Sequence, residues 1–171
     1  EDTLATITLT GSDVENDSLT FAVVVQPAHG TLTPGALPST LNYQPSTNYH
    51  GPDSFTFTAS DGQTNSAAAT VSITVNPVND APTATPAIVN TLEDTSVSVT
   101  LTGTDVDGDT LTFTVTTSPT HGSLSGTPPN LIYTPTPNYS GSDQFSFTAN
   151  DGSTNSQSDT VSIVVLPVND A

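Results

Sequence analysis

The chain has 171 residues, no Lys or Arg, 17 Asp or Glu residues and a formal charge of −17. Proteins that bind nucleic acid or anionic membranes use basic side chains, so this composition excludes both kinds of partner. The chain has no Cys for a disulfide scaffold, and no apolar run long enough to suggest membrane insertion. Its length allows one large or two small domains.

Short stretches of alternating apolar and polar residues, separated by Gly, Pro, Asn and Asp, follow one another along the chain. This pattern predicts β-strands, and no segment has the periodicity of a helix. In the first half the expected strands are residues 4–10, 18–25, 31–33, 41–44, 54–59 and 69–76. In the second half they are residues 83–89, 96–102, 110–117, 123–125, 131–134, 144–149 and 160–166.

The two halves are copies of one unit. Glu1-Asp2-Thr3 recurs as Glu93-Asp94-Thr95, and both copies end in Pro-Val-Asn-Asp-Ala. We therefore predict an all-β fold of two tandem seven-stranded β-sandwiches, residues 1–80 and 81–171. The first copy has no counterpart of residues 82–92, which predict an edge strand that contains a proline. The first domain is thus expected to lack its N-terminal strand, through truncation or because a neighbouring chain donates it.

Sixteen of the 17 acidic residues form matched pairs between the copies, and only Asp159 stands outside the pattern. The pairs are Glu1/Glu93, Asp2/Asp94, Asp13/Asp105, Glu15/Asp107, Asp17/Asp109, Asp53/Asp143, Asp61/Asp151 and Asp80/Asp170. Like charges held close together cost free energy unless a cation joins them, and the chain supplies none. Numerous oxygen ligands on flexible loops favour Ca²⁺, which is the predicted cofactor.

Counting the chain reversals divides the acids between the two ends of each sandwich. In a tandem array the lower end of the first copy would meet the upper end of the second. The predicted ligands at this junction are Glu1, Asp2, Asp53, Asn79, Asp80, Asp105, Asp107, Asp109 and Asp151. The upper end of the first copy would contribute Asp13, Glu15 and Asp61, and the lower end of the second Glu93, Asp143, Asn169 and Asp170.

Several of these motifs resemble a known family. Phe147-Thr148-Ala149-Asn150-Asp151-Gly152 resembles the end of a cadherin repeat, and Asp105-Val106-Asp107 resembles the cadherin Asp-x-Asp loop. Both copies are similar to the cadherin-like tandem repeats of large bacterial surface and biofilm adhesins, whose signature is Val78-Asn79-Asp80-Ala81-Pro82 here.

The resemblance implies a Greek-key (Ig/cadherin-like) fold for each sandwich, and it implies roles for individual residues. Glu1 and Asp53 would be acids at the base of one repeat, Asn79 and Asp80 linker ligands, and Asp105, Asp107 and Asp151 ligands at the top of the next. Pro77 stands where animal cadherins have the first linker Asp, so one ligand is missing.

The first hypothesis is an extracellular, cell-surface stalk stiffened by calcium, whose partners are neighbouring repeats or identical chains in a fibre. The second is a self-assembling filament subunit joined by strand complementation, which the missing strand suggests. The third is an accessory carbohydrate-binding module. No Ser/His/Asp set recurs with a nucleophile elbow, so an enzyme is not expected.

Two plainer interpretations remain open. The acids could form a salt-tolerant, solvated surface, although such charges scatter over faces whereas these gather at turns. His29 and His121 lie in matched Pro-x-His-Gly turns, where a structural role is expected rather than a catalytic or ligand role.

Overall fold

The computed structural model describes residues 1–169, and every regular element in that range is a β-strand. The chain divides into two compact units, Glu1–Val78 and Asn79–Ala171. The sequence places the boundary two residues further along the chain. No helix among the described residues is long and apolar enough to cross a membrane.

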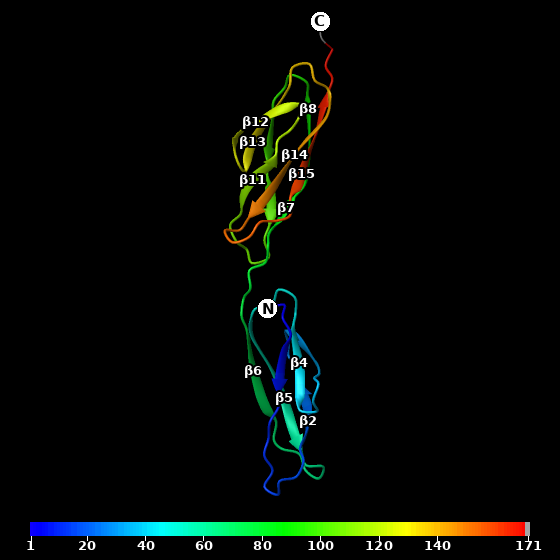
Figure 1. The fold of residues 1–171 in the computed structure, drawn as a ribbon, viewed down its shortest axis with the longest axis vertical. Coiled ribbons are helices and arrows are strands. Elements are labelled where there is room, and N and C mark those ends of the chain that lie inside the picture. Colours follow the sequence, from blue (N-terminus) through cyan, green and yellow to red (C-terminus); the bar gives the residue numbers. More distant parts are fainter. Residues whose placement is uncertain (170–171) are drawn as a thin grey trace. The chain divides into compact units, whose positions relative to one another are not determined.

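The first unit contains two three-stranded sheets, whose strand orders are β1-β4-β3 and β2-β5-β6. The strands are β1 (Ala5–Thr8), β2 (Thr20–Val25), β3 (Gly30–Pro34), β4 (Thr40–Pro45), β5 (Gly51–Ser60) and β6 (Ala69–Val75). All pairings are antiparallel. Figure 1 shows β6 as an outer strand of its sheet.

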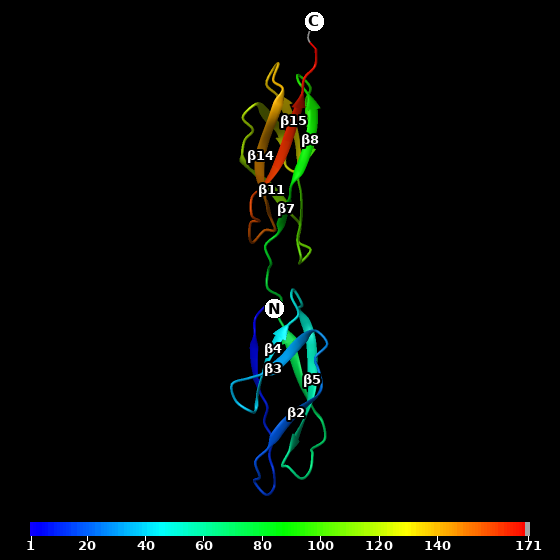
Figure 2. The same ribbon diagram turned by 90° about the vertical axis from the view of Figure 1, so that its right-hand side faces the viewer.

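The second unit has nine strands in sheets of order β11-β14-β15-β8, β12-β13-β9 and β10-β7. The strands are β7 (Thr83–Thr85), β8 (Ala87–Leu92), β9 (Val97–Thr100), β10 (Thr102–Thr104), β11 (Thr112–Thr117), β12 (Gly122–Thr127), β13 (Asn130–Pro135), β14 (Gly141–Asn150) and β15 (Asp159–Leu166). β8 pairs parallel to β15, and Figure 2 shows β15 between β14 and β8.

Two expected strands of the second unit are each broken into two. The segment 83–89 divides at Pro86, which has no amide hydrogen for a ladder, so β7 pairs with β10 and β8 with β15. The segment 96–102 divides at Leu101, whose amide donates to the carbonyl of Pro129 (2.8 Å). The all-β fold is confirmed, while the seven expected strands of the second unit become nine.

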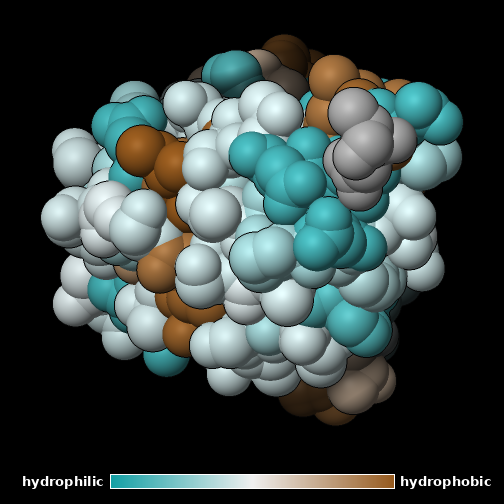
Figure 3. Space-filling model, turned by 90° about the horizontal axis from the view of Figure 1, so that it is seen from above, coloured by the Kyte–Doolittle hydropathy of each residue, from teal (hydrophilic) through white to brown (hydrophobic). Residues whose placement is uncertain are grey.

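The apolar residues of the strands face inward in both units. The second unit buries a large cluster around Phe145, Phe147 and Ile163, each at most 1% exposed. The corresponding cluster of the first unit is smaller, with Leu9, Phe55 and Phe57 at its centre. Seen from the end that bears the C-terminus, the surface consists mainly of hydrophilic and intermediate residues, with the hydrophobic ones in separate strips (Figure 3).

Candidate functional site

One loop of the second unit collects three carboxylates. Asp105, Asp107 and Asp109 follow β10, and an oxygen from each lies within 4.8 Å of the others. The loop closes through a hydrogen bond from the Asp109 amide to Asp105 Oδ1 (3.1 Å), while Gly108 adopts a φ of +80°. The Oδ2 atom of Asp105 is buried and accepts no hydrogen bond from the described residues. Such a set of oxygens is suited to a hard cation.

The segment that enters the second unit is attached to the same end. The Asn79 side chain donates to Asp151 Oδ2 (2.9 Å), and the Asp80 amide donates to Asp107 Oδ2 (2.9 Å). In Figure 1 the orange loop after β14, which contains Asp151, lies at the end of this unit where the chain enters. Six predicted ligands therefore gather here: Asn79, Asp80, Asp105, Asp107, Asp109 and Asp151.

Asp151 is held in place by its own loop. Its carboxylate accepts hydrogen bonds from the amides of Ser153 and Thr154 (both 2.6 Å) and from the Thr154 hydroxyl (2.9 Å). The Thr154 amide and the Asn79 side chain hold the pKa of this carboxyl well below its usual range. Asp151 is thus charged and fixed in orientation at any pH near neutrality.

The first unit repeats this loop chemistry in part. Asp13 Oδ1 accepts from the amides of Glu15 and Asp17 (2.9 and 3.0 Å). Asp61 accepts from the amides of Gln63 and Thr64, which hold its pKa below the usual range. Across residues 1–169, however, Asp13, Glu15 and Asp17 do not form a close group of three carboxylates.

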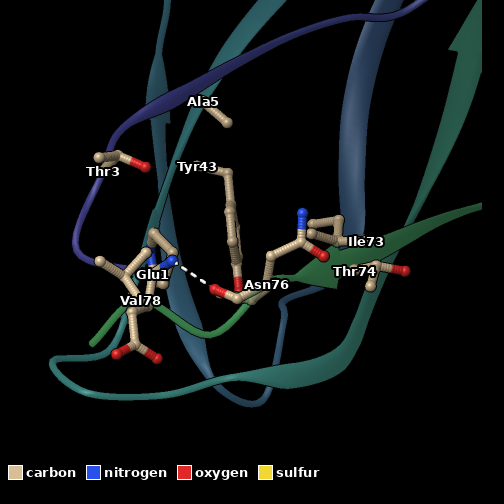
Figure 4. A pocket seen from close by; sticks show the side chains of 10 residues that line it. Glu1, Thr3, Ala5, Tyr43, Ile73, Thr74, Asn76 and Val78 are labelled. Atoms are coloured by element: carbon tan, nitrogen blue, oxygen red, sulfur yellow. Dashed lines mark hydrogen bonds between the residues drawn. The ribbon is translucent and has the colours of Figure 1, made fainter. Parts of the chain in front are cut away.

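Each unit buries a glutamate at the start of its repeat. The backbone nitrogen of Glu1 donates to the Asn76 carbonyl (2.8 Å, Figure 4), and the Glu93 amide donates to the Leu166 carbonyl (2.9 Å). Glu93 Oε1 accepts from the Val168 amide (2.5 Å). Among the described residues, both carboxylate oxygens of Glu1 are buried without a hydrogen bond, and His50 Nδ1 lies 3.6 Å from Oε2.

Asp143, predicted as a metal ligand, is buried beneath the turn before β12. Its carboxylate accepts from the amides of Thr120, His121 and Gln144 (2.9 Å each) and from the Tyr133 hydroxyl (2.8 Å). Burial alone would raise the pKa of this carboxyl, but the Thr120 amide and the Tyr133 hydroxyl outweigh it and lower the pKa. These hydrogen bonds hold the turn before β12 against the sheet that contains β14.

Asp53 repeats the arrangement in the first unit. It accepts from the amides of Ala28, His29 and Ser54 and from the Tyr43 hydroxyl (2.8 Å). Whether either aspartate also binds metal stays a prediction, but their lone pairs are largely committed to the fold. The sequence signal for this pairing is a Tyr ten residues before the Asp in both copies.

The two matched histidines have packing contacts. His29 stacks on Tyr49 and His121 on Tyr139, with ring centroids 4.1 and 4.2 Å apart. The stacked pairs cover the turns that the buried aspartates hold, which accounts for the recurrence of the Pro-x-His-Gly sequence.

Asp2 and Asp94, also predicted as ligands, each contact a turn of their own unit. Asp2 and Asp94 adopt positive φ angles of 52° and 57° and accept from the amides of Asn48 and Asn138. Asn169 follows β15, and Asp170 lies outside the described residues.

Comparison with known proteins gives a family match over most of the chain. Residues 1–74 and 79–164 each match the family described as "Bacterial Ig domain". Integrin beta-like protein B of Dictyostelium discoideum is 33% identical over 122 residues, which cover 63% of this chain and 6% of that protein. The chain therefore spans a small fraction of this curated relative.

Two solved structures illustrate the range of similarity. Human protocadherin-24 EC1-2 is 16% identical, with a TM-score of 0.60, over 95% of this chain and 88% of that one. The endo-fucoidan hydrolase MfFcnA4 is 27% identical over 99% of this chain and 27% of that one, with a TM-score of 0.43. The protocadherin match shows a shared cadherin-like fold, and the family match indicates Ig-like domains rather than an enzyme family. The chain belongs to the bacterial Ig domain family and contains two tandem copies of that domain.

Proposed function

We propose that the chain is an extracellular, calcium-binding structural repeat that forms part of a rigid stalk in an adhesin or surface fibre. The observation on which this rests is the close trio Asp105, Asp107 and Asp109, joined by the entering segment, in a chain without a single Lys or Arg. In this role the metal neutralises the acidic ends and joins adjacent repeats.

The residues present fit a bound Ca²⁺. The ligand atoms at the site are carboxylate and amide oxygens, and Ca²⁺ takes six to eight such oxygens, including backbone carbonyls and water. Among residues 1–169, Asp105 Oδ2 is buried without a hydrogen bond, which costs free energy unless a cation supplies the missing partner. The soft ligands that select other metals are absent, since the chain has no Cys or Met.

The anchored linker supports the bridging role. Asn79 and Asp80 contact the ligand loops of the second unit through their hydrogen bonds to Asp151 and Asp107. Metal bound by these loops would restrict the segment that connects the repeats, and Pro77 and Pro82 restrict its backbone further. That Glu1, Asp2 and Asp53 of the first unit supply further ligands stays a prediction.

An extracellular location agrees with the Ig-like family and with the expected affinity. Exposed acidic loops of this kind bind Ca²⁺ weakly, as extracellular modules do, with dissociation constants of about 10⁻⁴ to 10⁻³ M. Such sites require an environment in which calcium is abundant. The carbohydrate-binding alternative remains a prediction.

Melting curves in calcium and in EDTA test the proposal. Binding to the folded state alone adds about 2.7 kcal/mol of stability when the ion concentration is 100 times the dissociation constant. We expect calcium to raise the melting temperature of the parent chain. The double variant Asp105→Asn/Asp107→Asn should lose that increase, and Asp159→Asn, which removes an acid outside the repeated pattern, should keep it. Equal melting temperatures of the parent in calcium and EDTA would refute the proposal.

A further inference from the structure

The last strand of the large sheet in the second unit has an open edge. β8 ends the order β11-β14-β15-β8, and within residues 1–169 it pairs with β15 alone (Figure 2). The Glu93 amide donates to the Leu166 carbonyl (2.9 Å), so the odd-numbered residues of this segment direct their backbone groups toward β15. The amides of Ile88, Asn90 and Leu92 therefore face the open edge.

This edge has none of the features that usually protect an edge strand from further pairing. Residues 81–92 include no charged residue, and β8 itself contains neither a proline nor a bulge. Ile88 is 76% exposed and Leu92 46% exposed. The opposite edge strand of the same sheet, β11, has an irregularity in its register between Val115 and Thr117. Since charges, prolines and bulges normally prevent edge pairing, β8 is open to another strand.

The exposed apolar residues of β8 continue onto β15. Leu166 lies opposite Leu92 in the parallel register and is 46% exposed, and Val164 on the same face is 38% exposed. The equivalent positions of the first unit are polar, Thr74 and Asn76. The apolar patch on the outer face is therefore particular to the second unit, and the repeated fold does not require it.

We propose that β8 pairs antiparallel with β8 of a second copy of this chain, about a two-fold axis between the two Asn90 residues. The two four-stranded sheets would then become one continuous sheet. In this register Asn90 lies opposite Asn90 of the second copy, and Ile88 of each chain lies opposite Leu92 of the other. The backbone groups at the open edge pair with identical groups, and the exposed apolar side chains form two cross-strand pairs.

Charge and spacing favour a second copy as the partner. Two chains that each carry a charge of −17 repel one another, and an uncharged edge is a place where they can approach. In the proposed register Glu93 and Asp94, which follow β8, lie opposite Ala87 and Pro86 of the second copy, so no carboxylate faces another. Asn90 stands midway between the two apolar residues, which is the self-complementary spacing that a two-fold contact requires.

This contact goes beyond the proposed stalk role, because it joins two whole chains along their strands and uses none of the carboxylate loops. A partner rich in Lys or Arg would gain no charge attraction from residues 81–92, since the acids lie in the loops. The hydrogen bonds along the strand edge would supply affinity, and the apolar pairs would fix the register.

Sedimentation equilibrium of the full chain tests the proposal. We expect a reversible monomer–dimer equilibrium, weak because the contact is small and stronger at high ionic strength because salt screens the repulsion. Asn90→Asp places two carboxylates opposite each other at the two-fold axis and should weaken dimerisation at least about tenfold. Ser125→Asp adds the same charge to an exposed position of β12 and should leave dimerisation nearly unchanged. Asn90 and Ser125 are both exposed, so neither substitution disturbs a core.

A cross-linking experiment tests the register. The chain has no Cys, so a single introduced cysteine reports one position. In Asn90→Cys the two Cα atoms of the dimer would be about 5.5 Å apart, which is within the range that a disulfide spans. Oxidised glutathione should therefore cross-link Asn90→Cys as a dimer, whereas Ser125→Cys should remain largely monomeric.

Three results would overturn the proposal. The first is a parent chain that stays monomeric at about 1 mM in high salt. The second is a dimer that Asn90→Asp weakens no more than Ser125→Asp does. The third is equal cross-linking of the two cysteine variants. All samples contain EDTA, so the outcome does not depend on ion binding and is separate from that of the proposed function.

Discussion

At the residue scale, the recurring Tyr–Asp pair stabilises a turn in each unit, although both residues stand in a sequence context typical of a surface. Asp143 takes four hydrogen bonds of 2.8 to 2.9 Å from Thr120, His121, Gln144 and Tyr133. Burial and the adjacent carboxylate raise the pKa of the Tyr133 phenol, which therefore stays protonated and donates to Asp143. The pair joins β13 and β14 to the turn before β12 inside the second unit.

Asp143→Asn should destabilise the second unit by roughly 2 to 3 kcal/mol, because hydrogen bonds to a buried charge are lost and an amide hydrogen faces backbone donors. Urea unfolding monitored by hydrogen exchange of β14 would measure the change. Asp159→Asn is the control, since Asp159 accepts one bond within the described residues, from the Thr160 amide, and should cost less than about 1 kcal/mol. An Asp143→Asn variant as stable as this control would show that the pair is not structural.

The buried carboxylates of Asp53 and Asp143 should make the free energy of unfolding depend on pH in the acid range. Their pKa values are lowered in the folded state, so their contribution is present above the unfolded value of about 4 and is lost as the pH falls through the folded value. The stability difference between the parent and Asp143→Asn should therefore be constant near neutrality and shrink below about pH 4. A difference that grew on acidification would contradict this sign.

At the element scale, the alternation of apolar residues was enough to predict most strands, because one face of each strand is buried. The strands from β11 to β15 lie where the pattern places them, although β14 (Gly141–Asn150) is longer than the predicted 144–149. The sequence predicts an edge strand that contains Pro86, but not its division into β7 and β8. Pro86 has no amide hydrogen to donate. The change of partner from β10 to β15 on either side of it depends on tertiary pairing, which alternation does not encode.

The predicted metal ligands also fall into two groups, which differ in how far apart in the sequence their contacts lie. The paired acids at turns pointed to Asp105, Asp107 and Asp109, which do lie close together because they share one short loop. Asp53 and Asp143 belong to the same repeated pattern. Each, however, accepts hydrogen bonds from backbone amides of a turn that is far from it in the sequence. Recurrence alone cannot distinguish a carboxylate that binds a metal ion from one that stabilises the fold.

The start of β12 offers a prediction at this scale. A Cβ on Gly122 would lie 2.4 Å from the ring of Tyr133, which is fully buried. Gly122→Ala should therefore cost roughly 1 to 3 kcal/mol through overpacking. Ser123→Ala on the exposed face of the same strand should change the free energy of unfolding by less than about 0.5 kcal/mol. Chemical denaturation of both variants gives the comparison, and similar stabilities would contradict the packing argument.

At the scale of the whole molecule, the two units should differ in stability. The second buries a cluster of eleven residues and the first a cluster of three, since the first lacks the strands that cover its edge. Calorimetry should show two transitions, with hydrogen exchange assigning the lower one to residues 1–78. A single transition in which β5 and β14 lose protection together would mean that the units unfold as one.

Calcium should also change the flexibility of the tandem repeat. In the proposed mechanism the carboxylates near the linker repel one another without the ion and share a cation when it is bound. Small-angle scattering should give a narrower range of dimensions for the parent in calcium than in EDTA. Asp105→Asn/Asp107→Asn should resemble the EDTA sample in both buffers, and wild-type dimensions of this variant in calcium would contradict the stalk mechanism.

The most direct test of the central claim is isothermal titration of calcium into the metal-free chain. We expect saturable binding with a dissociation constant of about 10⁻³ M or tighter, abolished or strongly weakened in Asp105→Asn/Asp107→Asn and retained in Asp159→Asn. Absence of binding by the parent at millimolar calcium, or equal binding by the parent and the double variant, would contradict the account.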